Sequence, residues 1–177
     1  MIKEEYMLKQ VVALLLAVVL FTGCGSDRDL TDLSPLLKLQ DDKKFKEVLV
    51  YSDEMINAGS SDDHLFYWIH RTRMQANHGL YNELMSRYHL FDQSELLDDD
   101  HKKITAMIDS AVKLTKKMKE ELDLSKRYLD KIVVDKSYSS GGMDAEFMEI
   151  AKSWHNIDVA NVQNAKKEVM KILEEIA

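Results

Sequence analysis

Residues 104–132 read ITAMIDSAVKLTKKMKEELDLSKRYLDKI. Apolar or small side chains recur in this stretch at alternating steps of four and three residues. That spacing places them on one stripe of an α-helix and leaves the charged side chains on the opposite side. The stripe therefore predicts one long helix that packs closely along another helix. Its members are Ile104, Ile108, Ala111, Thr115, Met118, Leu122, Ser125, Leu129 and Ile132.

The composition of the whole chain also favours helices. The 177 residues include only one Pro and six Gly, and 45% are hydrophobic while 31% are charged. This balance is typical of a globular protein that can bury a core. The sequence therefore predicts an all-α fold made of antiparallel helical hairpins, arranged either as helical repeats or as an irregular bundle.

A second long helix is predicted near the C-terminus. It follows Ser139-Ser140-Gly141-Gly142, a loop sequence. Asn156 and Asp158 favour helix ends over helix interiors, so an interruption at 155–158 stays open. We expect residues 92–177 to form a long helical hairpin. The expected apolar positions of its second helix are Phe147, Ile150, Trp154, Ile157, Val162, Ala165, Val169, Ile172 and Ile176.

Shorter helices are predicted before residue 92. Ser34 is expected to cap the first of them, with Pro35 at its first position, and Gly59 is expected to end the second. Asn77-His78-Gly79 predicts a tight break. The predicted helices are 36–40, 43–58, one from Asp62 or Asp63 to about residue 77, and 80–91.

Residues 66–91, FYWIHRTRMQANHGLYNELMSRYHLF, resemble one unit of the tetratricopeptide repeat family. The matching positions are Trp68, Gly79, Tyr81 and Tyr88, and the departing ones are Arg71, Thr72 and Leu84. The resemblance implies two short antiparallel helices and a partner-binding face on Phe66, Ile69, Arg73 and Ala76. The alternative is that Phe66 and Ile69 belong to the core and that Arg73 is solvated.

The N-terminus has the pattern of a signal peptide. Residues 11–21 form an unbroken apolar run, which is too short to span a bilayer, and Lys3 and Lys9 precede it. Translation from Met1 or from Met7 is compatible with this pattern.

Leu20-Phe21-Thr22-Gly23-Cys24 resembles the lipobox of bacterial lipoproteins. The resemblance implies a signal peptide over residues 1–23, lipid attachment at Cys24, a tether over 24–34 and one helical domain over 35–177. Gly25 after the cysteine implies the outer membrane, facing the periplasm or the cell surface, if the host has one. Two alternatives stay open, namely a thiol buried beside a core helix and an ordinary secretory signal.

No pattern of catalytic residues occurs in the sequence. The net charge of −7 argues against binding to nucleic acid, and the single cysteine excludes an internal disulfide. The spacing of the six histidines does not fit a metal site. We therefore expect no enzymatic activity, no cofactor, no metal and no small-molecule substrate. The histidines are His64, His70, His78, His89, His101 and His155.

These features predict a protein anchored in the cell envelope by a lipid. The leading hypothesis is a non-enzymatic scaffold or assembly accessory that binds another envelope protein. The alternative is a small immunity or exclusion lipoprotein that neutralises a toxin, a phage or a plasmid-transfer component. The acidic charge suits both hypotheses and does not separate them.

Overall fold

The computed structural model describes residues 29–91, 98–134 and 143–176. The chain divides into two units, Met1–Leu30 and Thr31–Ala177. The predicted signal peptide over 1–23, the lipid-attachment residue Cys24 and the loop at 139–142 lie outside the described residues.

All the described secondary structure is helical, so the predicted all-α fold with two long C-terminal helices is confirmed. The described residues contain no strand. The helices are α2 (Ser34–Asp41), α3 (Phe45–Ala58), α4 (Asp63–Tyr88), α5 (Asp98–Val134) and α6 (Met143–Ile176).

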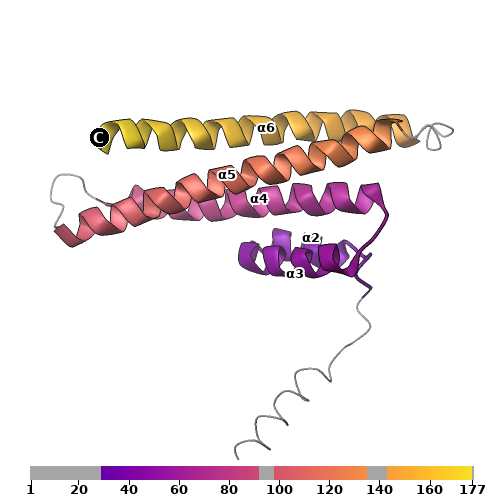
Figure 1. Cartoon of the computed structure of the whole chain (residues 1–177), viewed down its shortest axis with the longest axis horizontal. Coiled ribbons are helices and arrows are strands. Elements are labelled where there is room, and N and C mark those ends of the chain that lie inside the picture. The colour runs from indigo at the N-terminus through magenta and orange to yellow at the C-terminus, as the bar shows by residue number, and fades with distance from the viewer. Residues whose placement is uncertain (1–28, 92–97, 135–142, 177) are drawn as a thin grey trace, which may run out of the picture. The chain divides into compact units, whose positions relative to one another are not determined.

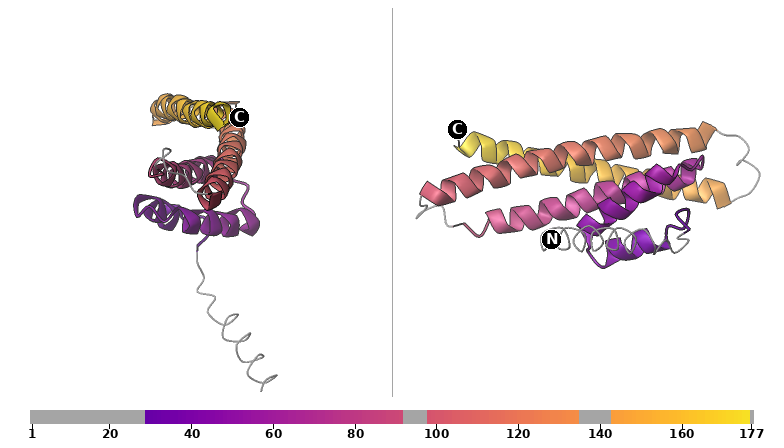
Figure 2. Two further views of the ribbon diagram at one scale, coloured as in Figure 1. Left: turned by 90° about the vertical axis from the view of Figure 1, so that its left-hand side faces the viewer. Right: turned by 60° about the horizontal axis from the view of Figure 1, so that its bottom comes forward.

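Within the unit Thr31–Ala177, the three long helices α4, α5 and α6 run side by side, and the chain reverses direction between each and the next (Figure 1). The short helices α2 and α3 pack on α4, on the side away from α6 (Figure 2). Helix α4 is thus the centre of the unit, because α2, α3, α5 and α6 all pack on it.

The predicted apolar stripe of α5 is confirmed. Its members from Ile104 to Ile132 are buried, apart from Thr115, which is half-buried. They meet the buried faces of α4 and α6 in two clusters, as side chains repeating every three or four residues should. One cluster consists of Tyr67, Leu129, Ile132 and Ala151. The other consists of Met74, Tyr81, Met85, Tyr88, Ile104, Ile108, Ala111, Met118, Leu122, Val162, Ala165, Val169 and Ile172.

The predicted break at Asn77-His78-Gly79 is wrong, because α4 continues without interruption from Asp63 to Tyr88. Gly79 has a packing role instead. A Cβ added to it would overlap three atoms of the Phe45 ring, so the missing side chain lets α3 approach the backbone of α4. The two short helices implied by the tetratricopeptide resemblance are therefore one helix in this structure.

The helix ends follow the sequence in part. Asp62 caps α4, since its carboxylate accepts a hydrogen bond from the backbone N–H of His64 at 2.8 Å. Gly59 ends α3 in the left-handed conformation, as expected. The prediction that Ser34 caps α2 is wrong, because Ser34 is already inside the helix and Leu33 precedes it.

Helix α6 also continues through residues 155–158, so the sequence does not interrupt the helix there. The expected apolar stripe is wrong at two positions in its N-terminal half. Ile150 and Ile157 are 40% and 54% exposed, whereas Ala151 and Asp158 face the core. The reason is electrostatic: Asp158 turns inward to meet an arginine of α4.

Candidate functional site

Helix α4 is enclosed along most of its length. Every residue from Asp63 to Tyr81 is buried or half-buried, although many are polar. Buried polar groups need hydrogen-bond partners. Two arginines two residues apart, Arg71 and Arg73, find theirs on different neighbouring helices and organise two separate clusters.

The Arg73 cluster joins α3, α4 and α5. It consists of Arg73, Glu121, His70, Ser52 and Asp53. Nε of Arg73 donates to Oε1 of Glu121 at 2.7 Å, and Nδ1 of His70 lies 2.7 Å from Oε2 of the same carboxylate. Nη1 of Arg73 donates to the Ser52 hydroxyl at 2.7 Å and also pairs with Asp53. One guanidinium therefore connects three helices.

The polar groups of the Arg73 cluster hydrogen-bond to one another. Burial alone would raise the pKa of Glu121, but the hydrogen bonds from His70 and Arg73 outweigh it and lower this pKa. The Ser52 hydroxyl donates to the carbonyl of Leu49 at 2.9 Å while it accepts from Arg73. Ser52 thus lacks the adjacent base that activates a serine nucleophile, and the cluster serves to hold helices together.

The Arg71 cluster joins α4 to α6. It consists of Arg71, Asp158, Trp68 and Trp154. Nε of Arg71 donates to Oδ2 of Asp158 at 2.9 Å. The guanidinium carbon lies 4.7 Å from the ring centre of Trp154 and 5.7 Å from that of Trp68, which is within the range of cation–π attraction. One ion pair and two indole rings therefore fix α6 against α4.

Asp158 is the partner of this ion pair whose charged form is disfavoured by burial. It is only 2% exposed. Burial raises its pKa, and the attraction and hydrogen bonds from Arg71 and Gln75 only partly oppose that effect. Burial also lowers the pKa of both His78 and His155, which Asp158 partly counteracts. The contact between α4 and α6 thus holds two histidines with a lowered pKa, His78 and His155, and one buried carboxyl with a raised pKa.

Tyr67 belongs to the same region. Its hydroxyl is buried and has no hydrogen-bond partner among the described residues. Burial raises the pKa of Tyr67 to about 12, although the charge of Arg71 opposes the rise. Tyr67 is therefore a neutral phenol near neutral pH.

The four residues predicted to face a partner lie inside the unit. Ile69 and Ala76 are 0% exposed, so they belong to the core. Phe66 is half-buried, and its ring stacks on that of Tyr128 at 5.1 Å. Arg73 is neither partner-facing nor solvated, because it is held in its own cluster. The prediction of a partner-binding face on these residues is therefore corrected.

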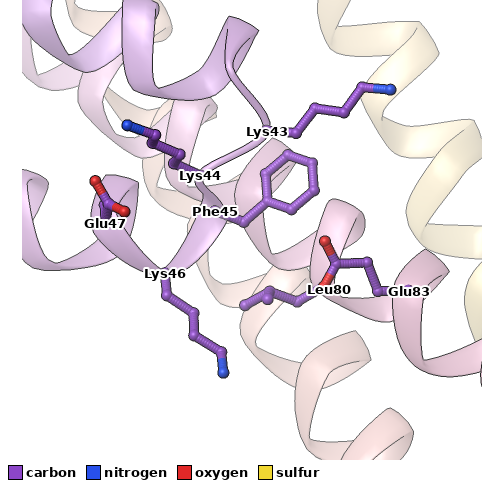
Figure 3. Close-up of a pocket in the computed structure, with 7 residues that line it drawn as sticks. All are labelled: Lys43, Lys44, Phe45, Lys46, Glu47, Leu80 and Glu83. Carbon is purple, nitrogen blue, oxygen red and sulfur yellow. The ribbon is translucent and has the colours of Figure 1, made fainter.

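A surface pocket of about 220 Å³ lies beside Phe45, and Leu80 and Glu83 of α4 form part of its wall. The side chains of Lys43, Lys44 and Lys46 surround it, but Figure 3 shows their ammonium groups pointing in different directions. The three cations therefore do not converge on one anion.

The exposed side of α6 differs from the other exposed helix surfaces around it. Between Lys152 and Lys166, no exposed side chain carries a charge. The single carboxylate in this stretch, Asp158, faces inward. We name these exposed residues the outer face of α6: Ser153, Asn156, Ile157, Ala160, Gln163 and Asn164.

Sequence reasoning missed Glu121, Asp158 and the outer face of α6. A signal was present for Asp158, since it stands seven residues after Ala151 and four before Val162, at the spacing of a buried stripe. A charged residue at such a position indicates a paired cation on the facing helix. Glu121 gives no such signal, because it lies beside the stripe of α5 in a run of charged residues.

Scanned against protein-family models, and compared with curated proteins and with solved structures, the chain matches none of them. Within the described ranges, no helix is both long enough and apolar enough to cross a membrane. Over the same residues, no three His, Cys, Asp or Glu side chains come together as a metal ion would require.

Proposed function

We propose that this chain is a lipid-anchored protein of the bacterial cell envelope that binds another protein as a non-enzymatic scaffold. The observation that carries the binding role is the outer face of α6. It extends over about three turns without an exposed charge, on a chain in which 31% of residues are charged. Depletion of charge is the compositional signature of the centre of a protein interface.

The anchoring role rests on Leu20-Phe21-Thr22-Gly23-Cys24 at the end of the apolar run 11–21. The lipobox resemblance implies two or three acyl chains on Cys24. Each buried methylene contributes about 0.8 kcal/mol, so several chains hold a protein on a bilayer where one does not. The outer membrane is the proposed location, because Gly25 follows the cysteine.

The Arg71 cluster supports a scaffold by fixing α6 to α4. Nε of Arg71 on α4 donates to Asp158 of α6 at 2.9 Å. A surface on a rigid helix loses little conformational entropy on binding. The outer face of α6 is therefore presented in a fixed shape.

The test combines lipid labelling with site-specific crosslinking of the full chain in cells. Wild type is expected to incorporate labelled palmitate and to sediment with membranes, whereas Cys24→Ser does neither. A photo-crosslinking amino acid at position 157 is expected to capture a protein. The same amino acid at position 112, an exposed valine on the charged side of α5, is the matched control.

Unchanged processing and membrane binding of Cys24→Ser would remove the anchoring role. Absence of any protein crosslink from position 157 would remove the binding role. Capture of an incoming toxin or phage protein at position 157, together with protection of the cell, would replace the scaffold with the immunity hypothesis.

A further inference from the structure

Two faces of α6 compete for the core in the N-terminal half of this helix. The periodicity of the sequence favours the face that carries Ile150, Trp154 and Ile157. In the structure the face one residue further along is inside instead, so Ala151 and Asp158 are buried while Ile150 and Ile157 are exposed. The helix therefore buries a carboxylate and leaves two isoleucines at the surface, which reverses the usual order of burial.

A rotation of the helix about its axis exchanges the two faces. Successive residues of an α-helix lie about 100° apart around that axis. Ile150 and Ile157 directly precede Ala151 and Asp158, so a rotation by about 100° brings each isoleucine to the place of its neighbour. A helix accommodates such a rotation where it takes up one extra residue in a single wide turn, which is a π-bulge. From Val162 to Ile172 the buried stripe is the one that the sequence predicts, so the rotation is confined to the residues before this stripe.

Arg71 of α4 stabilises the face that is inside. Its Nε donates to Oδ2 of Asp158 at 2.9 Å, and its guanidinium carbon lies 4.7 Å from the ring centre of Trp154. Without Arg71, Asp158 would be a buried charge without a partner, which is strongly destabilising. Rotation would then move Asp158 out of the core and bury the two isoleucines, and burial of apolar surface is favourable. The choice between the two faces therefore depends on one ion pair.

The packing around this half of α6 is compatible with a rotation. The described buried cluster that holds it has four members, Tyr67, Leu129, Ile132 and Ala151, whereas the cluster along the C-terminal half has thirteen. Because isoleucine is larger than Ala151, this end of α6 would also move away from α4 as it rotates. The observed orientation has a further cost, since Nδ1 of His155 is buried without a hydrogen-bond partner among the described residues. Rotation would carry His155 to the exposed place of Asn156.

We propose that the N-terminal half of α6 is a switch that opens and closes the outer face of α6, and that the ion pair between Arg71 and Asp158 holds this face open. The inference rests on the proposed function, because it concerns the regulation of the same face. In the closed state Ile157 is in the core and Lys152 takes the exposed place of Ser153, so the face loses its apolar centre and gains a charge. A partner that binds only the open state shifts the population towards it.

The first experiment measures how fast a maleimide reagent labels thiols in the purified full chain. Ile157→Cys reports the open state, in which position 157 is exposed, and Ala151→Cys reports the closed state, in which position 151 is exposed. Labelling is read by peptide mass spectrometry, which keeps these sites apart from Cys24. In the wild-type background the thiol at position 157 is expected to react at least about tenfold faster than the thiol at position 151, because the open state predominates.

Arg71→Leu is expected to reverse this order. The thiol at position 157 is expected to react about tenfold slower than in the wild-type background, and the thiol at position 151 about tenfold faster, because the population moves to the closed state. Opposite changes are specific to a rotation, since a loosened or unfolded α6 would expose both positions. Acceleration at both positions, or no change at either, overturns the inference.

The matched control is Arg87→Leu, which removes an exposed arginine from the same helix. It is expected to change neither labelling rate by more than about twofold. Circular dichroism is expected to show the same helix content for Arg71→Leu as for Arg87→Leu, because the rotation relieves the unpaired charge without unfolding. Loss of helix in Arg71→Leu alone contradicts the switch.

The double variant Arg71→Leu with Asp158→Leu tests the cause of the rotation. It replaces the ion pair by two apolar side chains, so position 158 no longer carries a charge that is unfavourable in the core. The open state is expected to return, with the thiol at position 157 reacting within about twofold of its rate in the wild-type background. A thiol at position 157 that stays protected in the double variant shows that the charge of Asp158 does not drive the rotation, and this overturns the inference.

The outcomes separate this inference from the proposed function. If the two rates change in opposite directions but the photo-crosslinker at position 157 captures no protein, the rotation stands and the binding role fails. If position 157 captures a protein but Arg71→Leu changes neither rate, the binding role stands and the switch fails. If both hold, capture at position 157 is expected to fall at least about fivefold in cells that carry Arg71→Leu. Unchanged capture in these cells overturns the regulation of the face by the switch.

Discussion

Arg71 and Arg73 lie two residues apart on the same helix, yet they hold it in different ways. Arg73 shares Glu121 with a second donor, His70, and the pKa of this carboxyl falls. Arg71 also shares Asp158 with a second donor, Gln75, but burial of that more deeply buried carboxyl outweighs both, and its pKa rises. The comparison indicates that the groups around Glu121 outweigh the cost of burying its charge, whereas those around Asp158 do not. We therefore expect the α3 and α5 side of α4 to be the stronger one.

The largest expected effect comes from Glu121→Gln. This substitution leaves two donors, Arg73 and His70, without their shared carboxylate in a largely buried place. Breaking such a pair by removing one partner is expected to lower the free energy of unfolding by about 3 kcal/mol. Urea denaturation followed by circular dichroism measures the loss.

The matched control for this prediction is Glu120→Gln, one residue earlier on α5. Glu120 is exposed and forms an ion pair with Lys116, with Nζ of Lys116 4.0 Å from Oε1 of Glu120. Exposed pairs of this kind contribute little, so the change is expected to stay within about 0.5 kcal/mol. Equal losses for the two variants would show that the Arg73 cluster does not stabilise the fold.

Gly79→Ala is expected to act on the same side of α4 with a smaller effect. Alanine favours a helix over glycine by about 1 kcal/mol, so propensity alone predicts stabilisation. The new Cβ, however, meets the Phe45 ring, and overpacking of this kind costs about 1 to 3 kcal/mol. The free energy of unfolding is expected to fall by about 1 kcal/mol, as measured in urea.

The double variant Gly79→Ala with Phe45→Leu tests the cause. Its loss is expected to be smaller than the sum of the two single losses, because leucine leaves room for the new methyl group. Additive losses would mean that contact with the Phe45 ring is not the reason why alanine at position 79 is unfavourable.

Much of the fold was predictable from the local sequence pattern, and the errors in the prediction have a common cause. The stripe of α5 follows from side-chain spacing alone, and the structure confirms it. Gly79 and Asp158 were read by their local preferences, as a turn residue and a helix-end residue. Both preferences were overridden by a tertiary contact, with Phe45 in one case and with Arg71 in the other. A partner more than thirty residues away cannot be read from helical periodicity.

The candidate site was less predictable than the fold. Assigning Ile69, Arg73 and Ala76 to a partner-binding face assumed two short helices that leave one side open. In the structure α4 is one helix with neighbours on several sides, so these positions are enclosed. Predicting the outer face of α6 would have required knowing that Asp158 faces inward. The inward orientation of Asp158 places Ile150 and Ile157 on the surface.

Asp158→Asn tests the weaker side of α4. Because burial already raises the pKa of Asp158, removing its charge also removes a cost, and the asparagine oxygen is still able to accept a hydrogen bond from Arg71. Arg71 keeps its place between the two indole rings. The loss in urea denaturation is expected to be about 1 kcal/mol, well below that of Glu121→Gln. A loss as large as that of Glu121→Gln would remove the difference between the two clusters.

The smallest expected effect is the pH dependence of the α6 side. The pKa values of His78 and His155 are lowered from 6.5, so their contribution to stability is full above pH 6.5 and is lost as the pH falls through the lowered values. The pKa of Glu121 is lowered from 4.5, so Glu121 loses its contribution only below that pH. Comparing urea denaturation at about pH 7.5 and about pH 5.5 therefore probes the histidines without Glu121.

Asp158 acts on both histidines through its charge. Its negative charge makes the folded histidines easier to protonate, which opposes the loss of stability on acidification. The wild-type loss between the two pH values is expected to be less than about 1 kcal/mol per histidine. In Asp158→Asn this effect of the carboxylate disappears, so the loss is expected to become larger than in wild type. If the free energy of unfolding of Asp158→Asn falls no more than that of wild type between the two pH values, the charge of Asp158 does not affect the protonation of the histidines. The two sides of α4 would then differ in geometry but not in the pH dependence of their stability.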